Sequence, residues 1–280
     1  MRALRHLRAL QRRSPRAVFA WSALLAYAAL AVSVQLGASV GGQGPDPVWA
    51  AARARGTLRV AADLGYYPFT WVEGGRPTGH DIELATLIAR RLGLDVEVVP
   101  SGLDSIFDDL AARRADLAAS ALPYTPEQGW RARFSHFYFN AGQVLVVHQG
   151  SPLRDRSGLG GLRLGAALGS DGDTWARAQQ RSGQRFTLVD DYDTSAEALD
   201  ALRAGRIDAA VVENVAALTA INGASGLRLA EALTLDPYVL AVAPEAYQLQ
   251  GEVNRALDAL IAEGELTRLG AKWFVPRQSD

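Results

Sequence analysis

The sequence predicts an α/β protein made of two similar lobes, each built on a mostly parallel sheet. From Thr57 onward, short apolar β-type runs alternate with amphipathic helical runs, which is typical of such sheets. Residues 195–213 also repeat the order of residues 105–120: a helix, a basic turn, an aspartate and a strand of small residues. Asp116 and Asp208 occupy equivalent places in the two repeats. We interpret both as structural residues just before buried strands.

The first lobe is expected to alternate strands and helices up to residue 120. The helix at 103–114 has apolar residues every three or four positions from Leu103 to Leu110, which forms one stripe facing a core. The expected elements are a strand at 57–63, a helix at 82–93, a strand at 95–99, the helix at 103–114 and a strand at 115–120.

The second lobe is expected to follow the same pattern and to be bracketed by two crossovers. Two β-rich runs, 142–148 and 237–243, lie at its ends and predict paired crossover strands, so the chain returns to the first lobe with a helix at 252–266. We assign residues 44–148 plus 236–280 to the first lobe and 149–235 to the second. The expected elements between the crossovers are strands at 162–167 and 186–190, helices at 173–181 and 214–221, and the repeated unit at 195–213.

Residues 1–43 precede the fold as a basic flank, an apolar segment and a linker. The first 16 residues contain six arginines and no acid, and residues 17–40 carry no charge. At about 1.5 Å rise per residue, such a helix spans a bilayer core of roughly 30 Å. The segment is either a retained membrane anchor or a cleaved signal peptide, since Ala38 and Ser39 would permit cleavage. A buried core helix is the third alternative, which the arginine block disfavours.

Composition excludes several other classes of protein. The chain has no cysteine, which excludes disulfides and thiolate metal sites. Its four histidines are scattered without metal-pair spacing, and its glycine-rich run 158–165 lacks the lysine of a phosphate loop. Beyond the arginine block the chain is acidic, which disfavours nucleic acid as a partner. We therefore expect no metal, no cofactor and no catalytic residue.

Short motifs follow several of the expected strands in a fixed order. They are YYPF, TPE, GSDGDTW, GRIDAAVVE and RLGAKWF, and they lie between about residue 55 and residue 274. In this order the chain resembles the extracytoplasmic solute-binding proteins, family 3, of polar amino-acid ABC transporters. The resemblance implies a two-lobed periplasmic-binding-protein fold with two crossover strands and an interlobe cleft that closes on a ligand by hinge motion. It also implies a small-molecule ligand, an ABC transporter permease as partner and a periplasmic or extracellular location.

The resemblance also implies which residues contact the ligand. Tyr66 of YYPF would stack on it, while Asp63, Asp171 and Glu213 would accept its cationic group. Leu103 stands where an aromatic wall is expected, and Ala121 stands where a second serine is expected. Together with the departures from the family pattern, the predicted ligand-binding set is Asp63, Tyr66, Leu103, Ser120, Ala121, Gln128, Arg131, Ser170, Asp171 and Glu213.

Gln128 is the main departure from the family pattern. The family usually has an arginine at this position, which clamps the α-carboxylate of the ligand. Gln128 either contacts the ligand or completes a capping box with Thr125 and Pro126. Arg131 either replaces the missing clamp or is a surface arginine. The site gains acid and loses base, so polyamines and other organic cations join amino acids as expected ligands.

Several of these residues also have purely structural interpretations. Asp63 would cap a turn, and Asp171 or Asp173 would cap the helix at 173–181. Tyr67 and Phe69 are expected to pack in the core.

The expected function is binding of a small polar solute rather than catalysis. One alternative is a membrane-anchored sensory module. The other is a periplasmic dehydratase on the same fold, which would be expected to keep a basic clamp for a dicarboxylate substrate.

Overall fold

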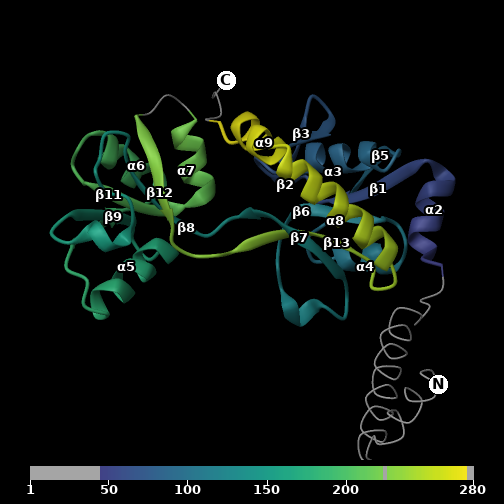
Figure 1. Ribbon diagram of the computed structural model, residues 1–280, viewed down its shortest axis with the longest axis horizontal. Helices are drawn as coiled ribbons and strands as arrows, with labels where there is room; N and C mark the ends of the chain where they lie inside the picture. Colours follow the sequence, from purple (N-terminus) through teal and green to yellow (C-terminus); the bar gives the residue numbers. More distant parts are fainter. Residues whose placement is uncertain (1–44, 223–225, 276–280) are drawn as a thin grey trace, which may run out of the picture. The chain divides into compact units, whose positions relative to one another are not determined.

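Two five-stranded sheets organise the part of the chain that the structure describes. The computed structural model describes residues 45–222 and 226–275 (Figure 1). Residues Asp46–Asp280 form one unit, which contains both sheets. Each sheet carries its own helices, so the expectation of two α/β lobes is confirmed.

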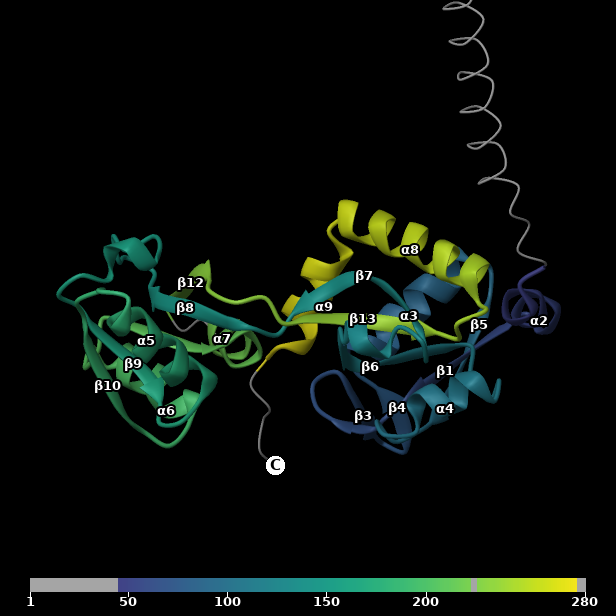
Figure 2. The same ribbon diagram turned by 90° about the horizontal axis from the view of Figure 1, so that it is seen from below.

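The first sheet combines strands from both ends of the described chain. Its strand order is β5-β1-β6-β13-β7. The central strand β6 is parallel to β1 and antiparallel to β13, and α4 and α8 lie on opposite faces of the sheet (Figure 2). The strands are β1 (Thr57–Ala62), β5 (Asp95–Pro100), β6 (Leu117–Pro123), β7 (Arg133–Asn140) and β13 (Pro237–Val242); the helices are α2 (Pro47–Arg55), α3 (His80–Arg91), α4 (Ile106–Ala111), α8 (Tyr247–Ala262) and α9 (Glu265–Trp273).

A small antiparallel sheet is attached to the first lobe after β1. It consists of β2 (Gly65–Tyr66), β3 (Thr70–Glu73) and β4 (Arg76–Thr78). Phe69 is fully buried between its first two strands and packs edge-to-face on Phe139, Tyr238 and Phe274. Phe69 is therefore a core residue, as expected.

The second sheet has the strand order β10-β9-β11-β8-β12. Strand β11 is parallel to β9 and antiparallel to β8. The strands are β8 (Gln143–His148), β9 (Arg163–Ala167), β10 (Thr187–Tyr192), β11 (Ala209–Glu213) and β12 (Leu227–Ala232); the helices are α5 (Asp171–Arg181), α6 (Ser195–Arg203) and α7 (Asn214–Ile221), and there are 3₁₀ turns η2 (Pro126–Gln128) in the first lobe and η3 (Arg156–Leu159) in the second.

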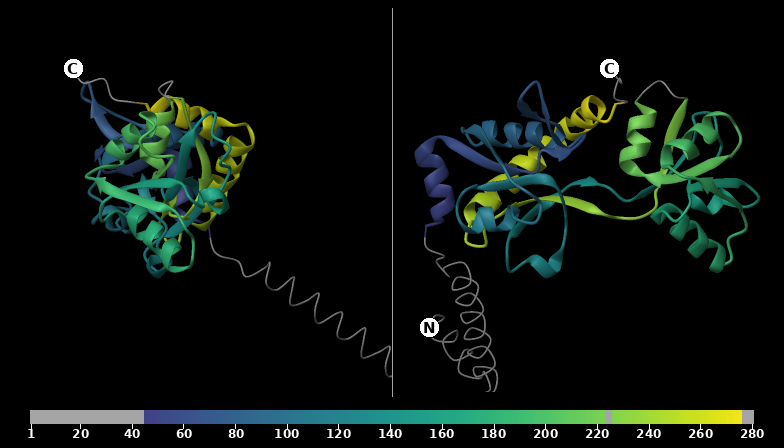
Figure 3. Two further views of the ribbon diagram at one scale, coloured as in Figure 1. Left: turned by 90° about the vertical axis from the view of Figure 1, so that its left-hand side faces the viewer. Right: turned by 180° about the vertical axis from the view of Figure 1, so that it is seen from behind.

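The two sheets are joined by two short crossovers (Figures 2 and 3). Hydrogen bonds connect the two crossovers to each other. Ala141 N–H donates to Asp236 O at 2.8 Å, and Gln143 N–H donates to Thr234 Oγ1 at 2.7 Å. Because β8 pairs with β11 and β12, residues 143–148 lie in the second sheet rather than in the first lobe, where the boundary at 148 had put them. The division into lobes at other residues stays a prediction.

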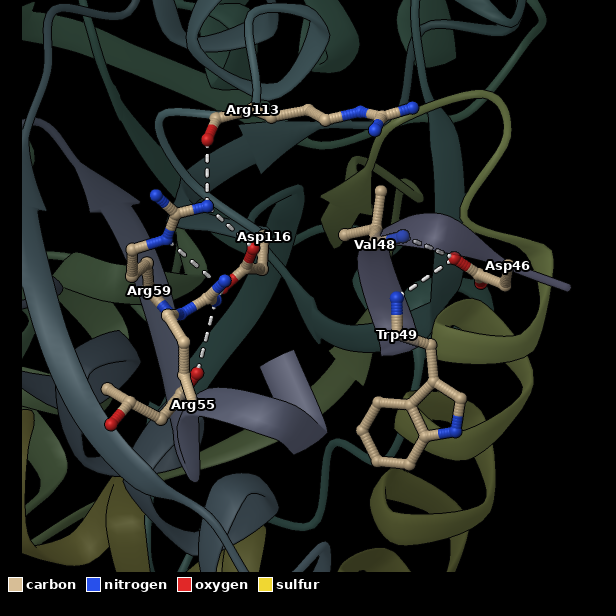
Figure 4. Close-up of polar contacts among 8 residues, drawn as sticks. Asp46, Val48, Trp49, Arg55, Arg59, Arg113 and Asp116 are labelled. Atoms are coloured by element: carbon tan, nitrogen blue, oxygen red, sulfur yellow. Dashed lines mark hydrogen bonds and ion pairs between the residues drawn. The ribbon is translucent and has the colours of Figure 1, made fainter. Parts of the chain in front are cut away.

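Asp116 and Asp208 repeat the same contact in the two lobes. Asp116 accepts hydrogen bonds from the backbone and guanidinium of Arg59, and also from Arg55 (Figure 4). Asp208 accepts the equivalent bonds from the backbone and guanidinium of Arg163. In each lobe, an arginine in one strand thus hydrogen-bonds to the aspartate that directly precedes the neighbouring strand. The structural interpretation of both aspartates is confirmed.

Several elements differ from the prediction. Strands β7 and β12 and helix α2 were not expected, and the C-terminal helix is divided into α8 and α9 at Gly264, whose φ is 77°. Asp46 begins α2 by accepting from Val48 and Trp49 N–H through Oδ1 (Figure 4). Its Oδ2 accepts from two amides at the start of α8, so one carboxylate caps two helices.

None of the helices in the described part of the chain is both long and apolar enough to cross a membrane. The predicted anchor or signal segment, residues 17–40, lies outside the described residues.

Candidate functional site

The first lobe brings Asp63, which follows the last residue of β1, next to Ser120 in the middle of β6. Asp63 N–H donates to the buried Ser120 Oγ at 3.0 Å. Asp63 Oδ1 accepts from Gly65 N–H at 3.1 Å, which confirms its expected role as a turn cap. Ala121 follows Ser120 directly, with its backbone in the left-handed region at a φ of 48°. Both strands run in the same direction, so their carboxyl ends meet at one edge of the sheet.

Tyr66 lies beside this edge and is partly open to solvent. Its side chain is 42% exposed, and its ring stacks on Phe69 with centroids 5.3 Å apart. Its hydroxyl lies 3.4 Å from that of Tyr238. Burial and this hydrogen bond raise the pKa of Tyr238 far above its usual value, so Tyr238 stays protonated at neutral pH. Phe69 and Tyr238 therefore hold Tyr66 in place, while part of its ring faces solvent.

The loop after β6 does not contain the expected capping box. Thr125 is the N-cap residue and Pro126 follows it, but the element is the three-residue 3₁₀ turn η2, without a side-chain cap bond. The Oε1 atom of Gln128 is buried and has no hydrogen-bond partner in the structure. The capping-box interpretation is therefore wrong, because neither the Thr125 side chain nor Gln128 Oε1 makes the hydrogen bond that such a box requires.

Arg131 is engaged with neighbours in its own lobe. Its guanidinium donates to Asp108 at 2.8 Å and lies 5.3 Å from the centre of the Phe107 ring. Trp130 is 77% exposed, and Leu103 on a separate turn is 49% exposed. The structure thus gives Arg131 an acidic partner, and it places Leu103 and Gln128 on different loops of the first lobe.

The second lobe presents Ser170, Asp171 and Glu213 at the carboxyl ends of β9 and β11. Ser170 is the N-cap of α5, and its Oγ accepts from Asp173 N–H at 3.2 Å. The helix begins at Asp171, so the expectation that Asp171 or Asp173 caps it is wrong. Glu213 is half-buried, and its Oε2 accepts from Ser195 Oγ at 2.6 Å.

Gly172 explains how α5 comes so close to β11. A Cβ at this position would lie 2.8 Å from Val211 O, which is closer than real Cβ atoms approach. The glycine therefore lets the start of α5 pack directly on the strand that ends at Glu213. The Ser170–Asp171 loop and Glu213 are neighbours for this reason.

Three buried residues near the site were not predicted from the sequence. Asp81, Tyr138 and Tyr238 are buried polar residues behind the first-lobe edge. The signal for Asp81 was an acid in the first turn of an amphipathic helix directly after a glycine. The two tyrosines had no local signal, because only the order of the strands brings them to this edge.

Polar side chains from two sheets, joined by two crossovers, define a two-lobed solute-binding protein of the periplasmic-binding-protein fold. The chain belongs to the bacterial extracellular solute-binding proteins, family 3, which it matches over residues 58–276. The resemblance and the fold class predicted from the sequence are therefore confirmed. Extracytoplasmic solute binding follows from this membership. Within residues 45–222 and 226–275, no group of three or more potential ligands is placed to hold a metal.

Curated relatives match most of the chain. It is 28% identical over 250 residues to the L-cystine-binding protein TcyJ of Escherichia coli (strain K12), which covers 88% of this chain and 92% of TcyJ. It is 26% identical over 220 residues to the arginine-binding extracellular protein ArtP of Bacillus subtilis (strain 168), which covers 78% of this chain and 86% of ArtP.

Solved structures of the same fold include both binding proteins and an enzyme. The L-cystine solute receptor of Neisseria gonorrhoeae, in its unliganded open conformation, is 26% identical with a TM-score of 0.67, over 81% of this chain and 96% of the receptor. An ancestral cyclohexadienyl dehydratase is 25% identical with a TM-score of 0.69, over 80% of this chain and 95% of the enzyme.

Proposed function

We propose that this protein binds an amino acid or a related organic cation between its two lobes and delivers it to an ABC transporter permease. The observation that carries the proposal is the charge of the predicted site. Acids come from both lobes, as Asp63 and as Asp171 with Glu213, whereas the one predicted basic residue, Arg131, is paired with Asp108. Such a site favours a ligand with a positive charge.

Both lobes would supply contacts to the ligand. The partly exposed ring of Tyr66 would stack on the ligand, and Ser120 and Gln128 would offer neutral hydrogen bonds. The acids Asp63, Asp171 and Glu213 would accept the cationic group. The N-terminus of α5, capped by Ser170, would face any carboxylate through its backbone amides and its dipole. Leu103 and Ala121 would line the site without polar contact.

We favour binding over catalysis because of the same charge distribution. A dehydratase acting on a dicarboxylate would need a basic group to hold its substrate. At the family's usual arginine position this chain has Gln128, and Arg131 already has an acidic partner. The fold shared with an ancestral dehydratase is therefore not by itself an argument for catalysis.

The location and the partner are proposed together. We propose that residues 17–40 either anchor the protein to the outside of the cytoplasmic membrane or are removed on export. In both cases the two lobes face the permease from outside the cell or from the periplasm. An anchored sensory role remains the alternative, and it predicts ligand binding without dependence on a permease.

A ligand panel tests the proposal. Thermal unfolding of the purified protein would be followed with L-arginine, L-cystine, neutral and acidic amino acids, polyamines and quaternary amines. A ligand at about 100 times its Kd stabilises the folded state by roughly 2.7 kcal/mol, which is a readily measured shift. We expect cationic or zwitterionic compounds to raise the Tm. A shift with dicarboxylates alone would contradict the proposal and favour the dehydratase.

Uptake of the compound that binds separates transport from sensing. Cells that express the protein with its permease should lose uptake when the gene for the binding protein is deleted. Unchanged uptake would leave the sensory role as the better explanation.

A further inference from the structure

Asp81 is a fully buried acid behind the first-lobe half of the site. It lies in the first turn of α3 and is 0% exposed. Its Oδ2 accepts from Ala121 N–H at 2.6 Å and from the Tyr138 hydroxyl at 2.7 Å. Its Oδ1 lies 2.9 Å from His80 Nδ1. These three contacts stabilise the carboxylate inside the core, where a buried charge without partners would be strongly destabilising.

The Ala121 amide that Asp81 holds belongs to a strained residue. Ala121 has a φ of 48°, a left-handed conformation that is unfavourable for a residue with a Cβ. Such a backbone persists only where surrounding contacts hold it. Ser120 precedes this residue and accepts the hydrogen bond from Asp63 N–H. The backbone at Ala121 therefore sets the course of β6 directly after Ser120.

The backbone at the start of α3 also holds the turn that carries Tyr66, which is the other part of the site in the first lobe. His80 N–H donates to Pro68 O and Asp81 N–H donates to Phe69 O, both at 3.0 Å. A Cβ at Gly79 would lie 2.1 Å from Phe69 O, so this close approach requires glycine. Phe69 in turn stacks on Tyr66. The start of α3 thus fixes the turn that presents Tyr66.

The hydroxyl partner keeps its proton under all ordinary conditions. Burial, followed by the nearby Asp81 charge, raises the pKa of Tyr138 well above its usual value. Tyr138 therefore remains a donor to Asp81 at neutral pH.

We propose that Asp81 is a positioning residue for ligand binding: its side chain fixes Ala121 and Ser120, and its backbone fixes the Tyr66 turn. Asp81 does not touch the ligand itself. It aligns two loops that are far apart in sequence, so that the first-lobe contacts exist before a ligand arrives. Preorganised contacts of this kind strengthen binding, because the conformational entropy of these segments is lost on folding and not again on binding. This inference rests on the proposed function and names a further residue of the same site.

The test compares Asp81→Asn with Asp116→Asn in the full-length protein. Asparagine keeps the shape but removes the charge: its amide oxygen can still accept from Ala121 N–H and Tyr138, but as a weaker, neutral acceptor, while its NH2 group replaces the oxygen that faces His80 Nδ1. Asp116 is equally buried and directly precedes β6, on the side of the strand away from Ala121, so we expect its loss to affect stability alone. Two quantities would be measured: amide hydrogen exchange at Asp63 and Ala121 without ligand, and the Kd of L-arginine and L-cystine by calorimetry.

We expect Asp81→Asn to speed exchange at both amides and to raise the Kd by at least about tenfold. Asp116→Asn should lower the Tm without either effect. In an Ala121→Gly background the effect of Asp81→Asn should shrink, because glycine adopts a positive φ at no steric cost. An equal loss in both backgrounds, or in both aspartate variants, would mean that Asp81 is merely structural and would overturn the inference.

Two further results are decisive. If the wild type binds neither probe, the proposed ligand class fails, and amide exchange alone then decides whether Asp81 positions the loops. If Asp81→Asn does not fold, exchange in the wild type decides. Ala121 N–H should then be as protected as the core amides of β6, and exchange as fast as in exposed loops would refute the inference.

Discussion

At the residue scale, Glu213 is the acid whose role in binding is most directly testable. Its Oε2 accepts from Ser195 Oγ, and glutamine can accept the same bond through its amide oxygen. Glu213→Gln should therefore keep the fold while removing the charge. We expect the Kd of a cationic ligand to rise at least tenfold, a loss of about 1.4 kcal/mol, measured by calorimetry. Ser195→Ala is the matched control, because it removes the hydrogen bond but leaves the carboxylate. An affinity that is unchanged in Glu213→Gln would exclude Glu213 as the acceptor of the cationic group.

Gln128 supports a prediction in the opposite direction. Its buried, unpaired Oε1 indicates that the position is not used for a local cap. Gln128→Arg would restore the group that grips a carboxylate in two-pronged fashion, and charged hydrogen bonds of this kind contribute roughly 1.5–3 kcal/mol. We expect tighter binding of amino acids and little change for amines without a carboxylate. Gln128→Lys is the control, since it adds charge without the planar fork. Equal gains for both ligand classes would argue against a carboxylate clamp.

At the element scale, the contact between α3 and the Tyr66 turn depends on Gly79. A Cβ there would overlap Phe69 O, and the φ of 127° is itself unsuited to other residues. Gly79→Ala should lower both the Tm and the ligand affinity, because the turn must move away from the helix. Gly251→Ala is the control within α8, where no atom lies within 4 Å of the new Cβ. That change should leave affinity unchanged and stabilise the helix by about 0.5–1 kcal/mol. A Gly79→Ala protein with normal Tm and affinity would contradict the close packing.

The elements also show what sequence reasoning can and cannot reach. The alternation of short apolar runs with helical runs predicted α3, α5, α6, α7 and most parallel strands. Strand β7 was missed because its residues RFSHFYFN mix aromatic and polar side chains without a clear period. Helix α2 was missed although Asp46 and Pro47 gave a valid start signal, because its hydrophobic pattern is weak. At the site, motif positions predicted Tyr66 and Glu213 as ligand contacts. Asp81 required the fold, because its partners Ala121 and Tyr138 are distant in sequence.

At the scale of the whole molecule, both lobes contain carboxylates whose pKa is lowered in the folded state. Hydrogen bonds from Ser101 and Arg114 lower the pKa of Asp109 in the first lobe, and those from Arg163 lower the pKa of Asp208 in the second. A lowered folded pKa gives stability that is present above the unfolded value of about 3.9 and is lost as the pH falls through the folded value. We expect a nearly level Tm from pH 8 to about 5 and a fall below about pH 4. Asp208→Asn and Arg163→Gln should each make that fall shallower, since either change removes the pair. An identical acid profile in both variants and the wild type would refute this origin.

The two crossovers carry any motion of one lobe against the other, and their packing allows little room at Gly142. A Cβ at this position would lie 2.6 Å from Thr234 O in the opposite crossover. Gly142→Ala must therefore separate two segments that are otherwise held by bonds from Ala141 to Asp236 and from Gln143 to Thr234. We expect a lower Tm and a ligand-induced change in small-angle scattering that differs from the wild type, because the crossovers set which lobe orientations are accessible. Gly150→Ala, in a loop where nothing lies within 4 Å, controls for loss of a glycine. If Gly142→Ala closes on its ligand as the wild type does, the hinge lies elsewhere. If closure fails although Glu213 and Tyr66 are unchanged, the contacts of the two lobes bind the ligand only when the crossovers bring them together. This property distinguishes a two-lobed receptor from a protein with a pocket within one lobe.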